Sequence, residues 1–477
     1  MNADVIRLCK AVRDAGGRAM LVGGSVRDHL LNIESKDFDI EVYRLQPDSL
    51  RQVLEKIGTV NAVGGNFAVY KLVFFRSESA RTQPNDDVLK KNNRSEERFE
   101  VDVSLPRRES KTSRGHRGFV IEGDPFMEFD EAARRRDFTI NSILLDPLTS
   151  ETFDPYDGER DLSQRILRVV SPETFIEDSL RVLRAVQLAA RFEMTIDPAT
   201  IALCRTIDLS DLPHERIWGE FEKLLTLSKR PSIGLDAALE LLVLEKLFPE
   251  LLALAGGPAR KQGDPSEDMF LRTKGGLDEA VSLTATLPPP KRIAVMLAVL
   301  CHDIERTGVP AAIDQEPNSK VDPQLTSGVL DRLGLYTIGG YDVRSQVCSL
   351  VRDNRTPLEF YHRRDSTTDG DIRRLSQRVE IDLLYRVEKA WALGGGASTA
   401  AADWLIERAT TLDVQNGPPA PLLLGRHLVE AGIQPGPEIG KLLRSVYEMQ
   451  LDGKITTTEE ALDTARKRRL VESTQDT

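Results

Sequence analysis

The sequence predicts an α+β protein, with a small mixed or antiparallel sheet and its helices at the amino-terminal end and a mostly helical remainder. Two observations predict this fold class. Short apolar runs rich in β-branched and aromatic residues dominate the first part of the chain, and from about Asp161 onward apolar residues recur with a helical period. Because 477 residues are too many for a single core, we expect about three domains of roughly 150 residues each.

Four predicted strands lie in the first part of the chain. They are residues 19–23 (AMLVG), 37–43 (DFDIEVY), 67–75 (FAVYKLVFF) and 99–105 (FEVDVSL), each rich in residues that strands favour. Residues 76–98, between the last two strands, are polar and charged and almost free of apolar side chains. Because such a segment buries little apolar surface, we expect a mobile loop or insertion there.

The rest of the chain is predicted to be helical. Apolar residues recur every three to four positions in segments such as 179–192 (SLRVLRAVQLAARF) and 219–228 (GEFEKLLTLS), which is the pattern of an amphipathic helix. Breaks between helices are expected where glycine, proline and polar residues gather, at 254–268, 394–399 and 416–421.

The overall charge limits the partners that the protein can have. A formal net charge of -11 and a pI near 5.3 argue against nonspecific coating of nucleic acid, which usually needs a basic surface. A local basic groove is still compatible with this charge, because two basic clusters stand against the acidic background. They are Arg107, Arg108, Lys111, Arg114 and Arg117, and Arg134, Arg135 and Arg136.

Signals for a membrane or an oxidising compartment are missing from the sequence. No apolar run approaches the ~20 residues needed to cross a bilayer, and the first residues form a charged amphipathic pattern rather than a signal peptide. We therefore expect a cytoplasmic protein without a membrane partner. The four cysteines are scattered without a CxxC pair, and we expect reduced, mostly buried thiols at Cys9, Cys204, Cys301 and Cys348.

Residues 21–42 carry the first chemical signal. A strand ends at Gly23 and Gly24, and a helix that follows directly would point backbone N–H groups and the positive end of its dipole at a phosphate. Arg27 and Asp28 in its first turn add a phosphate-binding cation and a carboxylate that the dipole favours. A glycine pair alone usually marks an ordinary turn, so a phosphate site needs support from neighbouring residues.

Asp37 and Asp39 give that support. Residues two apart in a strand face the same side, so these carboxylates can share a divalent cation that also binds a triphosphate. A third acid on a neighbouring strand would let two cations sit ~4 Å apart for an in-line displacement. Asp102 is the candidate, and Glu100 competes with it because both lie on one face of the same predicted strand.

At this point the motifs carry a family resemblance. GGSVRD at 23–28, followed by DFD at 37–39, resembles the catalytic signature of the tRNA nucleotidyltransferase and poly(A) polymerase family, whose head is a polymerase-β-like nucleotidyltransferase. RRDFTINSI at 135–143 is similar to that family's ribose- and phosphate-contacting segment, with Ser142 where alanine is more usual. The resemblance implies nucleotide contacts for Gly23, Gly24, Arg27, Arg136, Asp137 and Asn141.

The segment 177–185 (EDSLRVLRA) concerns the choice of base. Asp178 and Arg181 are three residues apart, so the sequence predicts both on one helix face. Cytosine and adenine both present an amino donor beside a ring-nitrogen acceptor, so this pair can accept CTP and ATP and reject UTP and GTP. The alternative is an ordinary ion pair worth about 0.2–0.5 kcal/mol. The resemblance implies a protein template here, with Arg184 as a further nucleotide contact.

A second chemical signal lies far along the chain. His302 and Asp303 form an HD pair, which can ligate metal and hydrolyse phosphoesters, and some bacterial members of the family carry such a domain at this point. The positions expected to supply further ligands hold Arg272, Asn354 and Trp391. Since a guanidinium and an indole do not ligate metals, we predict an HD-like domain without metal or hydrolase activity. The pair would instead pack helices or form a local hydrogen bond.

The resemblance extends over nearly the whole chain. Residues 154–162 are similar to the family's hinge motif and 214–225 to its neck motif. The resemblance therefore implies four parts, which are a catalytic head (1–150), a helical neck with the base template (151–255), a degenerate HD-like body (260–393) and a tRNA-binding helical tail (401–477).

The function implied by the resemblance is addition or repair of the 3′-terminal CCA of tRNA from CTP and ATP. Asp37 and Asp39 would bind two Mg²⁺ ions, Asp102 would complete the site, and pyrophosphate would leave. A poly(A) polymerase, or an enzyme that adds only CC or only A, shares these motifs and is the alternative. An HD phosphohydrolase and a non-catalytic RNA-binding protein are the alternatives from other classes.

Overall fold

The computed structural model describes residues 2–34, 37–63, 69–74, 99–111, 119–256, 265–307, 323–432 and 436–475. The predicted loop at 76–98 lies outside these residues, as do Arg114 and Arg117 of the first basic cluster. The chain divides into two compact units, 1–212 and 213–477. This division is coarser than the four predicted parts, which remain a prediction.

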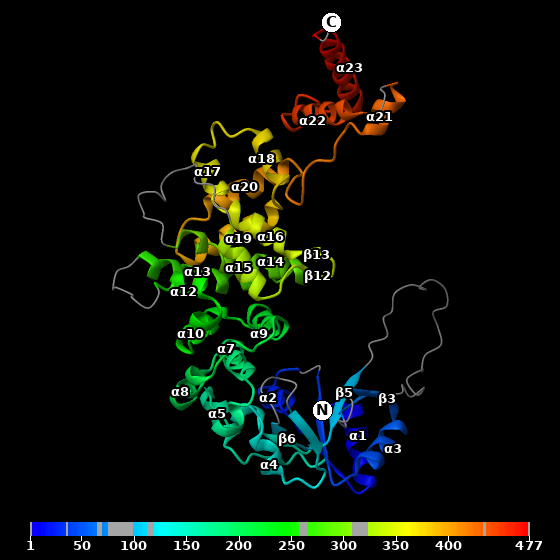
Figure 1. Ribbon diagram of the computed structural model, residues 1–477, viewed down its shortest axis with the longest axis vertical. Coiled ribbons are helices and arrows are strands. Elements are labelled where there is room, and N and C mark those ends of the chain that lie inside the picture. The colour runs from blue at the N-terminus through cyan, green and yellow to red at the C-terminus, as the bar shows by residue number, and fades with distance from the viewer. Residues whose placement is uncertain are drawn as a thin grey trace. The chain divides into compact units, whose positions relative to one another are not determined.

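The first unit is built on a seven-stranded sheet with the order β3-β4-β5-β2-β1-β8-β9 (Figure 1). Its strands are β1 (Arg18–Val22), β2 (Asp39–Tyr43), β3 (Gly58–Val63), β4 (Val69–Phe74), β5 (Glu100–Ser104), β8 (Leu144–Leu145) and β9 (Thr152–Phe153). The central neighbours β2 and β5 run parallel, and the other described pairs are antiparallel. The sheet is therefore mixed, and the four predicted strands are confirmed as β1, β2, β4 and β5. The expectation that Asp37 and Asp39 share one strand is wrong for Asp37, because β2 begins at Asp39.

One face of the sheet holds the main core. The helices α1 (Ala3–Asp14) and α3 (Pro47–Glu55) pack there, and Ile40 and Val42 of β2 point into that core. Because side chains alternate along a strand, Asp39 and Glu41 face the opposite side of the sheet. Burial of the apolar half of β2 thus fixes the direction of its acids.

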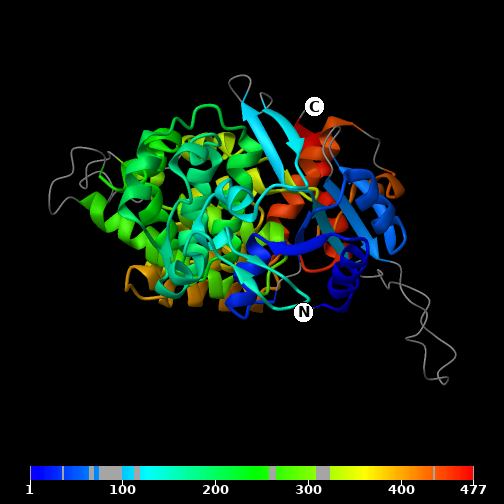
Figure 2. The same cartoon turned by 90° about the horizontal axis from the view of Figure 1, so that it is seen from below.

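The opposite face carries a smaller core and the site. Helix α4 (Phe129–Arg134) supplies Ala132 and Ala133, which pack with Val22 and Tyr43. The strands β6 (Arg107–Lys111) and β7 (Phe119–Gly123) form a separate antiparallel pair, drawn in cyan in Figure 2.

Short helices complete the first unit. They are α2 (Gly24–Leu30), η2 (Thr139–Asn141), α5 (Gly158–Gln164), α6 (Pro172–Phe175), α7 (Leu180–Phe192) and α8 (Pro198–Thr206), with β10 (Ile166–Leu167) parallel to β11 (Thr195–Ile196). A Cβ atom at Gly158 would lie 2.2 Å from the carbonyl oxygen of Thr139, so only glycine fits there. Asp161 also accepts a 2.8 Å hydrogen bond from the Thr139 hydroxyl. The predicted hinge segment thus holds the turn that contains Asn141.

The second unit is helical. Its main helices are α9 (His214–Leu227), α10 (Pro231–Glu240), α11 (Val243–Leu247), α12 (Pro249–Leu254), α13 (Pro265–Leu283), α14 (Pro289–Leu300), α15 (Gln324–Arg332), α16 (Val343–Arg352), α17 (Thr356–His362), α18 (Asp369–Ser376), α19 (Ile381–Gly394), α20 (Ala400–Thr411), α21 (Gly425–Glu430), α22 (Pro437–Leu451) and α23 (Thr458–Gln475). Short elements are η3 (Ile304–Arg306), β12 (Thr337–Ile338) and β13 (Tyr341–Asp342). The predicted break at 416–421 falls between helices, and the one at 394–399 does so after Gly394, the last residue of α19.

Close backbone contact joins α13 to α19 in the second unit, where a Cβ atom at Gly394 would lie 2.0 Å from the nitrogen of Gly276. Of the cysteines, Cys9, Cys204 and Cys301 are buried, Cys348 is half-buried, and all four are free thiols, as predicted. Among the described residues, no helix has the length and apolar character that a membrane span requires.

Candidate active site

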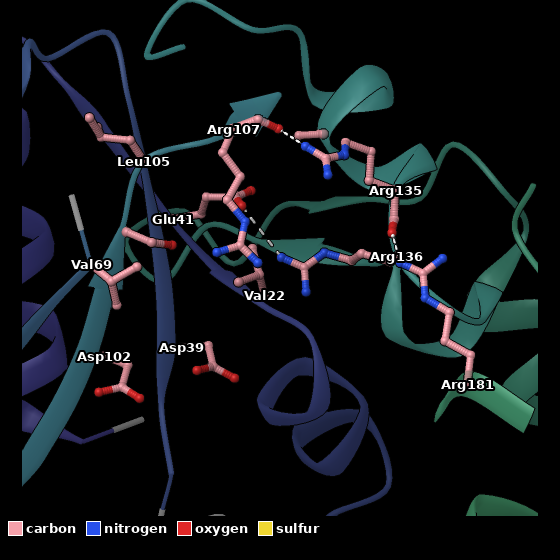
Figure 3. A pocket seen from close by; sticks show the side chains of 12 residues that line it. Val22, Asp39, Glu41, Val69, Asp102, Leu105, Arg107, Arg135, Arg136 and Arg181 are labelled. Atoms are coloured by element: carbon pink, nitrogen blue, oxygen red, sulfur yellow. Dashed lines mark hydrogen bonds and ion pairs between the residues drawn. The ribbon is translucent and has the colours of Figure 1, made fainter. Parts of the chain in front are cut away.

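Two neighbouring strands bring acidic side chains together. The parallel pairing of β2 with β5 sets Asp39 opposite Asp102, and the Asp102 N–H donates to the Phe38 carbonyl at 3.0 Å. Both aspartates line one pocket (Figure 3), whereas Glu100 does not belong to its lining. The Lys71 ammonium lies 3.9 Å from Asp102, with both side chains about half exposed. This register favours Asp102 over Glu100 as the third acid.

The surroundings of Asp39 disfavour its charged form. Loss of hydration raises the pKa of Asp39 above its ordinary value, and three carboxylates raise it further while Arg136 opposes them. Those carboxylates are Asp102, Asp37 and Glu41. A divalent cation would relieve this repulsion, and carboxylate oxygens are the ligands that Mg²⁺ prefers. In the described parts of the chain, however, no three acidic, histidine or cysteine side chains are already arranged to hold a metal ion.

Four arginines face these acids across the pocket, which has a volume of about 350 Å³. Figure 3 shows Asp39 and Asp102 next to one another and the arginines on the other side. The basic side consists of Arg107 of β6, Arg135, Arg136 and Arg181 of α7. A pocket with one acidic and one basic side suits a ligand that combines a metal ion with phosphate groups.

Glu41 and Gly23 help to position Arg136. An Arg136 nitrogen lies 3.6 Å from a Glu41 oxygen, and the Tyr43 hydroxyl donates to the other Glu41 oxygen at 2.6 Å. Gly23 has a φ of +70°, and a Cβ atom there would lie 3.0 Å from an Arg136 nitrogen and 3.7 Å from an Asp39 oxygen. Glycine therefore allows the turn before α2 to approach both sides of the pocket.

The start of α7 is held by backbone carbonyl groups. Arg181 donates to the carbonyls of Thr174 and Arg135, each at 2.7 Å, and Arg135 in turn donates to the carbonyl of Arg107. Asp178 lies two residues before the helix begins and accepts a hydrogen bond from the Leu180 N–H. The expectation that Asp178 and Arg181 share one helix is therefore wrong for Asp178. It sits in the turn that leads into the helix.

Other predicted nucleotide contacts lie in a buried network rather than in the pocket lining. Arg184 forms an ion pair with Asp137 at 2.6 Å, and Asp137 also accepts from the Asn141 side chain at 3.1 Å. Arg27 donates to the Asn141 side-chain oxygen at 2.8 Å. Burial would raise the pKa of Asp137, but Arg184 and the hydrogen bonds outweigh it and lower that pKa. The nucleotide contacts assigned to Arg27, Asp137, Asn141 and Arg184 remain predictions.

Three charged pocket residues, Glu41, Arg107 and Arg135, were missed as site residues in the sequence. Glu41 alternates with Ile40 and Val42 as Asp39 does, so the strand pattern alone could have identified it. Arg107 was noticed only as a member of a basic cluster. No local signal could have separated Arg107 from its neighbours, because the pairing of β6 with β7 brings it to the pocket.

The second unit contains the HD pair in a different setting. His302 and Asp303 are buried, and the two imidazole nitrogens lie 3.0 Å from Asp303 and 2.8 Å from Glu388. The Trp391 indole stacks on His302 with 4.6 Å between ring centroids and donates to Asp303 at 3.0 Å. Asn354 donates to the His302 carbonyl at 2.9 Å. The predicted local hydrogen bond of the pair is confirmed.

Oppositely charged side chains in this cluster shift the pKa values of one another. Asp303 and Glu388 raise the pKa of His302 to about 9 even though burial lowers it. His302 and Arg306 in turn hold the pKa of Asp303 down at about 2 against its burial. His302 is thus a protonated imidazolium between two carboxylates at neutral pH, and both of its nitrogens donate hydrogen bonds.

Family models match two parts of the chain. Residues 19–168 match the model described as "Poly A polymerase head domain", and residues 193–254 match "Probable RNA and SrmB- binding site of polymerase A". Except for Arg18, the first match contains every strand of the seven-stranded sheet and the pocket acids.

Curated relatives cover more of the chain. A multifunctional CCA protein of Xanthomonas campestris is 31% identical over 439 residues, which are 89% of this chain and 96% of that protein. A multifunctional CCA protein of Mannheimia succiniciproducens is 37% identical over 300 residues, but this match spans only 61% of this chain and 64% of that protein.

Solved structures share the fold. The Thermotoga maritima CCA-adding enzyme, complexed with tRNA, aligns over 98% of this chain and 96% of its own, with a TM-score of 0.61 and 19% identity. The Bacillus stearothermophilus CCA-adding enzyme, in complex with CTP, aligns over 99% of this chain and 100% of its own, with a TM-score of 0.60 and 20% identity. At such low identity these matches confirm the predicted α+β fold class alone.

Proposed function

The chain belongs to the family of poly(A) polymerases and CCA-adding tRNA nucleotidyltransferases, and from this membership we propose that it builds or repairs the 3′-terminal CCA of tRNA. CTP and ATP would be its substrates, and pyrophosphate would leave. The observation that carries the proposal is a single pocket in which Asp39 and Asp102 face four arginines. Relatives named multifunctional CCA protein support it, as do structural neighbours solved with tRNA, CTP and ATP. Such a reaction belongs in the cytoplasm, where tRNA is used.

The acidic side of the pocket would hold Mg²⁺. Asp39 and Asp102 supply hard oxygen donors from adjacent strands, and Asp37 lies two residues before Asp39. When bound, Mg²⁺ supplies positive charge that favours ionisation of a hydroxyl group and neutralises phosphate oxygens. The raised pKa of Asp39 fits this role, because burial and the neighbouring carboxylates both disfavour its charge, which a cation would stabilise.

The basic side of the pocket would bind the triphosphate. Arg136 and Arg107 offer guanidinium groups that can form paired hydrogen bonds with phosphate oxygens. Held in this way, the α-phosphate faces the acids, where the tRNA 3′-hydroxyl attacks it and the bond to the β-phosphate breaks. Asp178 and Arg181 would read the base at the start of α7, since Arg181 also lines the pocket. A mismatched base would leave polar groups unpaired.

The test is extension of tRNA transcripts that end before C, after C and after CC, with each nucleotide supplied alone. The proposal predicts that CTP extends the first two transcripts and ATP extends only the third, and that UTP and GTP are not used. Long A tracts would instead support a poly(A) polymerase, the activity named by the matching head model. Products that stop at CC, or that gain A alone, would identify a partial enzyme.

A further inference from the structure

We propose that Asp28 and Arg191 are positioning residues that set where the base-reading start of α7 lies, and so help to decide which nucleotide is accepted. The proposal rests on the proposed function, because it assigns a base-reading role to Arg181. Neither residue lines the pocket among the described residues. Both act from the end of a contact network that lies away from the pocket, where Asp28 meets the last turn of α7.

The carboxylate of Asp28 joins two helices. One oxygen accepts from two nitrogens of Arg27, at 2.9 and 2.6 Å, and the other oxygen lies 3.6 Å from Arg191 near the end of α7. The Asp28 side chain is only 9% exposed, and that of Arg27 only 5%. Because both groups are buried, removing one of them leaves the charge of the other without a partner and without full hydration by water.

The ring of Phe192 extends this joint. The Arg27 guanidinium lies 4.1 Å from the ring centroid and the Arg191 guanidinium 4.9 Å from it. Two cations therefore share one carboxylate and one aromatic ring at the carboxyl-terminal end of α7. The arrangement joins two helices, because its residues come from α2 and from the last turn of α7.

The same network continues to the pocket. Arg27 donates to Asn141, Asn141 donates to Asp137, and Asp137 pairs with Arg184 in the middle of α7. One turn earlier, Arg181 donates to the carbonyl of Arg135, which lines the pocket next to Arg136. Helix α7 is thus held at its start, its middle and its end, and the contact at its start lies at the pocket.

A tilt of α7 would transmit a change at its carboxyl-terminal end to Arg181 at its start. Arg191 lies ten residues after Arg181, which is about 15 Å of helix at 1.5 Å per residue. A rigid helix that loses its anchor at one end can tilt, and the tilt displaces the group at the other end. Base selection by hydrogen bonds depends on the positions of donors and acceptors, and a misplacement of about 1 Å can cost about a hundredfold, so a tilt of α7 costs discrimination.

The first experiment compares Asp28→Asn with Asp146→Asn in the full chain. Asp146 is a matched control, because it is also 9% exposed and pairs with an arginine, Arg18 at 2.9 Å, but has no contact with α7 in this network. Equilibrium titration measures the affinities for CTP and UTP in the presence of Mg²⁺. We expect Asp28→Asn to reduce the preference for CTP over UTP about tenfold or more. Asp146→Asn should keep the wild-type preference.

A folded Asp28→Asn protein with the wild-type CTP preference would overturn the proposal. Should this variant fail to fold, Arg191→Met and Arg191→Lys replace it. Lysine keeps the charge opposite Asp28, so we expect it to retain more of the preference than methionine does. Equal preferences in these two variants and the wild type would also overturn the proposal.

The binding titration separates this inference from the proposed function. A wild-type protein that prefers CTP but extends no tRNA would refute the proposed reaction, and loss of that preference in Asp28→Asn would still support the positioning role. A wild-type protein that extends tRNA, with an Asp28→Asn variant that selects bases equally well, would refute the positioning role alone.

Discussion

The two units each contain a cluster of acidic side chains, and the clusters differ in the source of their positive charge. In the first unit, Asp39 and Asp102 stand at an open pocket, and neighbouring carboxylates help to raise the pKa of Asp39. In the second unit, Asp303 is buried against a protonated His302, and its pKa falls to about 2. Burial and the repulsion among its carboxylates suit the first cluster to a metal ion. The second supplies its own cation.

The side chains around the HD pair determine whether it can bind a metal ion. The pair alone suggests a metal site. Trp391 stacks on the imidazole, and Asn354 binds the His302 backbone, so the residues at the expected ligand positions make packing contacts. His302 joins Asp303 to Glu388 of α19 through its two ring nitrogens.

The largest effect is expected from Asp39→Asn. Removing this charge weakens metal binding and the stabilisation of the reacting phosphate, which is worth several kcal/mol, so tRNA extension should fall about a thousandfold or more. Single-turnover extension with CTP measures the loss. His302→Asn is the comparison variant and should leave the extension rate of folded protein close to wild type. If the Asp39→Asn enzyme were still active, the assignment of the metal site to the first cluster would be wrong.

The next largest effect is expected on stability in the second unit. Asp303→Asn removes one partner of a buried ion pair and should destabilise that unit by about 3–5 kcal/mol. Urea unfolding followed by tryptophan fluorescence suits this measurement, because Trp391 lies in the cluster. A loss below about 1 kcal/mol would mean that the cluster contributes little to holding these helices.

The third acid allows a sharper test within the first cluster. Asp102 lines the pocket and Glu100 does not, so Asp102→Asn should slow extension about a hundredfold, whereas Glu100→Gln should change it less than about threefold. Both substitutions remove one charge from β5 and keep the shape of the side chain. If Glu100→Gln were the more damaging variant, the assignment of the third acid would be reversed.

The pH dependence of stability should show the cation of the second cluster. The folded-state pKa of His302 is raised from 6.5 to about 9, so its contribution is fully present below about pH 6.5 and is lost as the pH rises through 9. The pKa of Asp303 is lowered from 3.8 to about 2, so its contribution is present above about pH 4 and is lost as the pH falls through 2. Unfolding free energies of the wild type should decline between pH 6.5 and 9.5. In His302→Asn this decline should be smaller, and an equal decline would contradict the assignment.

Much of the first cluster could be predicted from the sequence, because strand alternation is a local property. Ile40 and Val42 mark the buried side of β2, and this alone fixes the side on which Asp39 lies. Placing two apolar runs in one sheet predicted a third acid beside Asp39, but the choice between Asp102 and Glu100 needed the strand register, which sets Asp39 opposite Asp102. Arg107 could not be assigned, because its place at the pocket depends on the separate pair of β6 and β7.

The roles of buried polar residues were harder to predict. The first turn of α2 suggested Arg27 as a phosphate ligand, yet its guanidinium is buried against Asp28, Asn141 and Phe192. Two of those partners lie more than a hundred residues away in the chain. Long-range contacts of this kind leave no periodic signal, so a charged residue in a motif can be an internal contact as readily as a ligand.

The number of bound metal ions distinguishes the two acidic clusters. Titration of the full chain with Mn²⁺, followed by electron paramagnetic resonance, counts bound ions in the wild type, in Asp39→Asn and in His302→Asn. If the first cluster alone takes metal, Asp39→Asn removes the binding and His302→Asn leaves it unchanged. Tight stoichiometric binding that survives Asp39→Asn and disappears in His302→Asn would contradict the account.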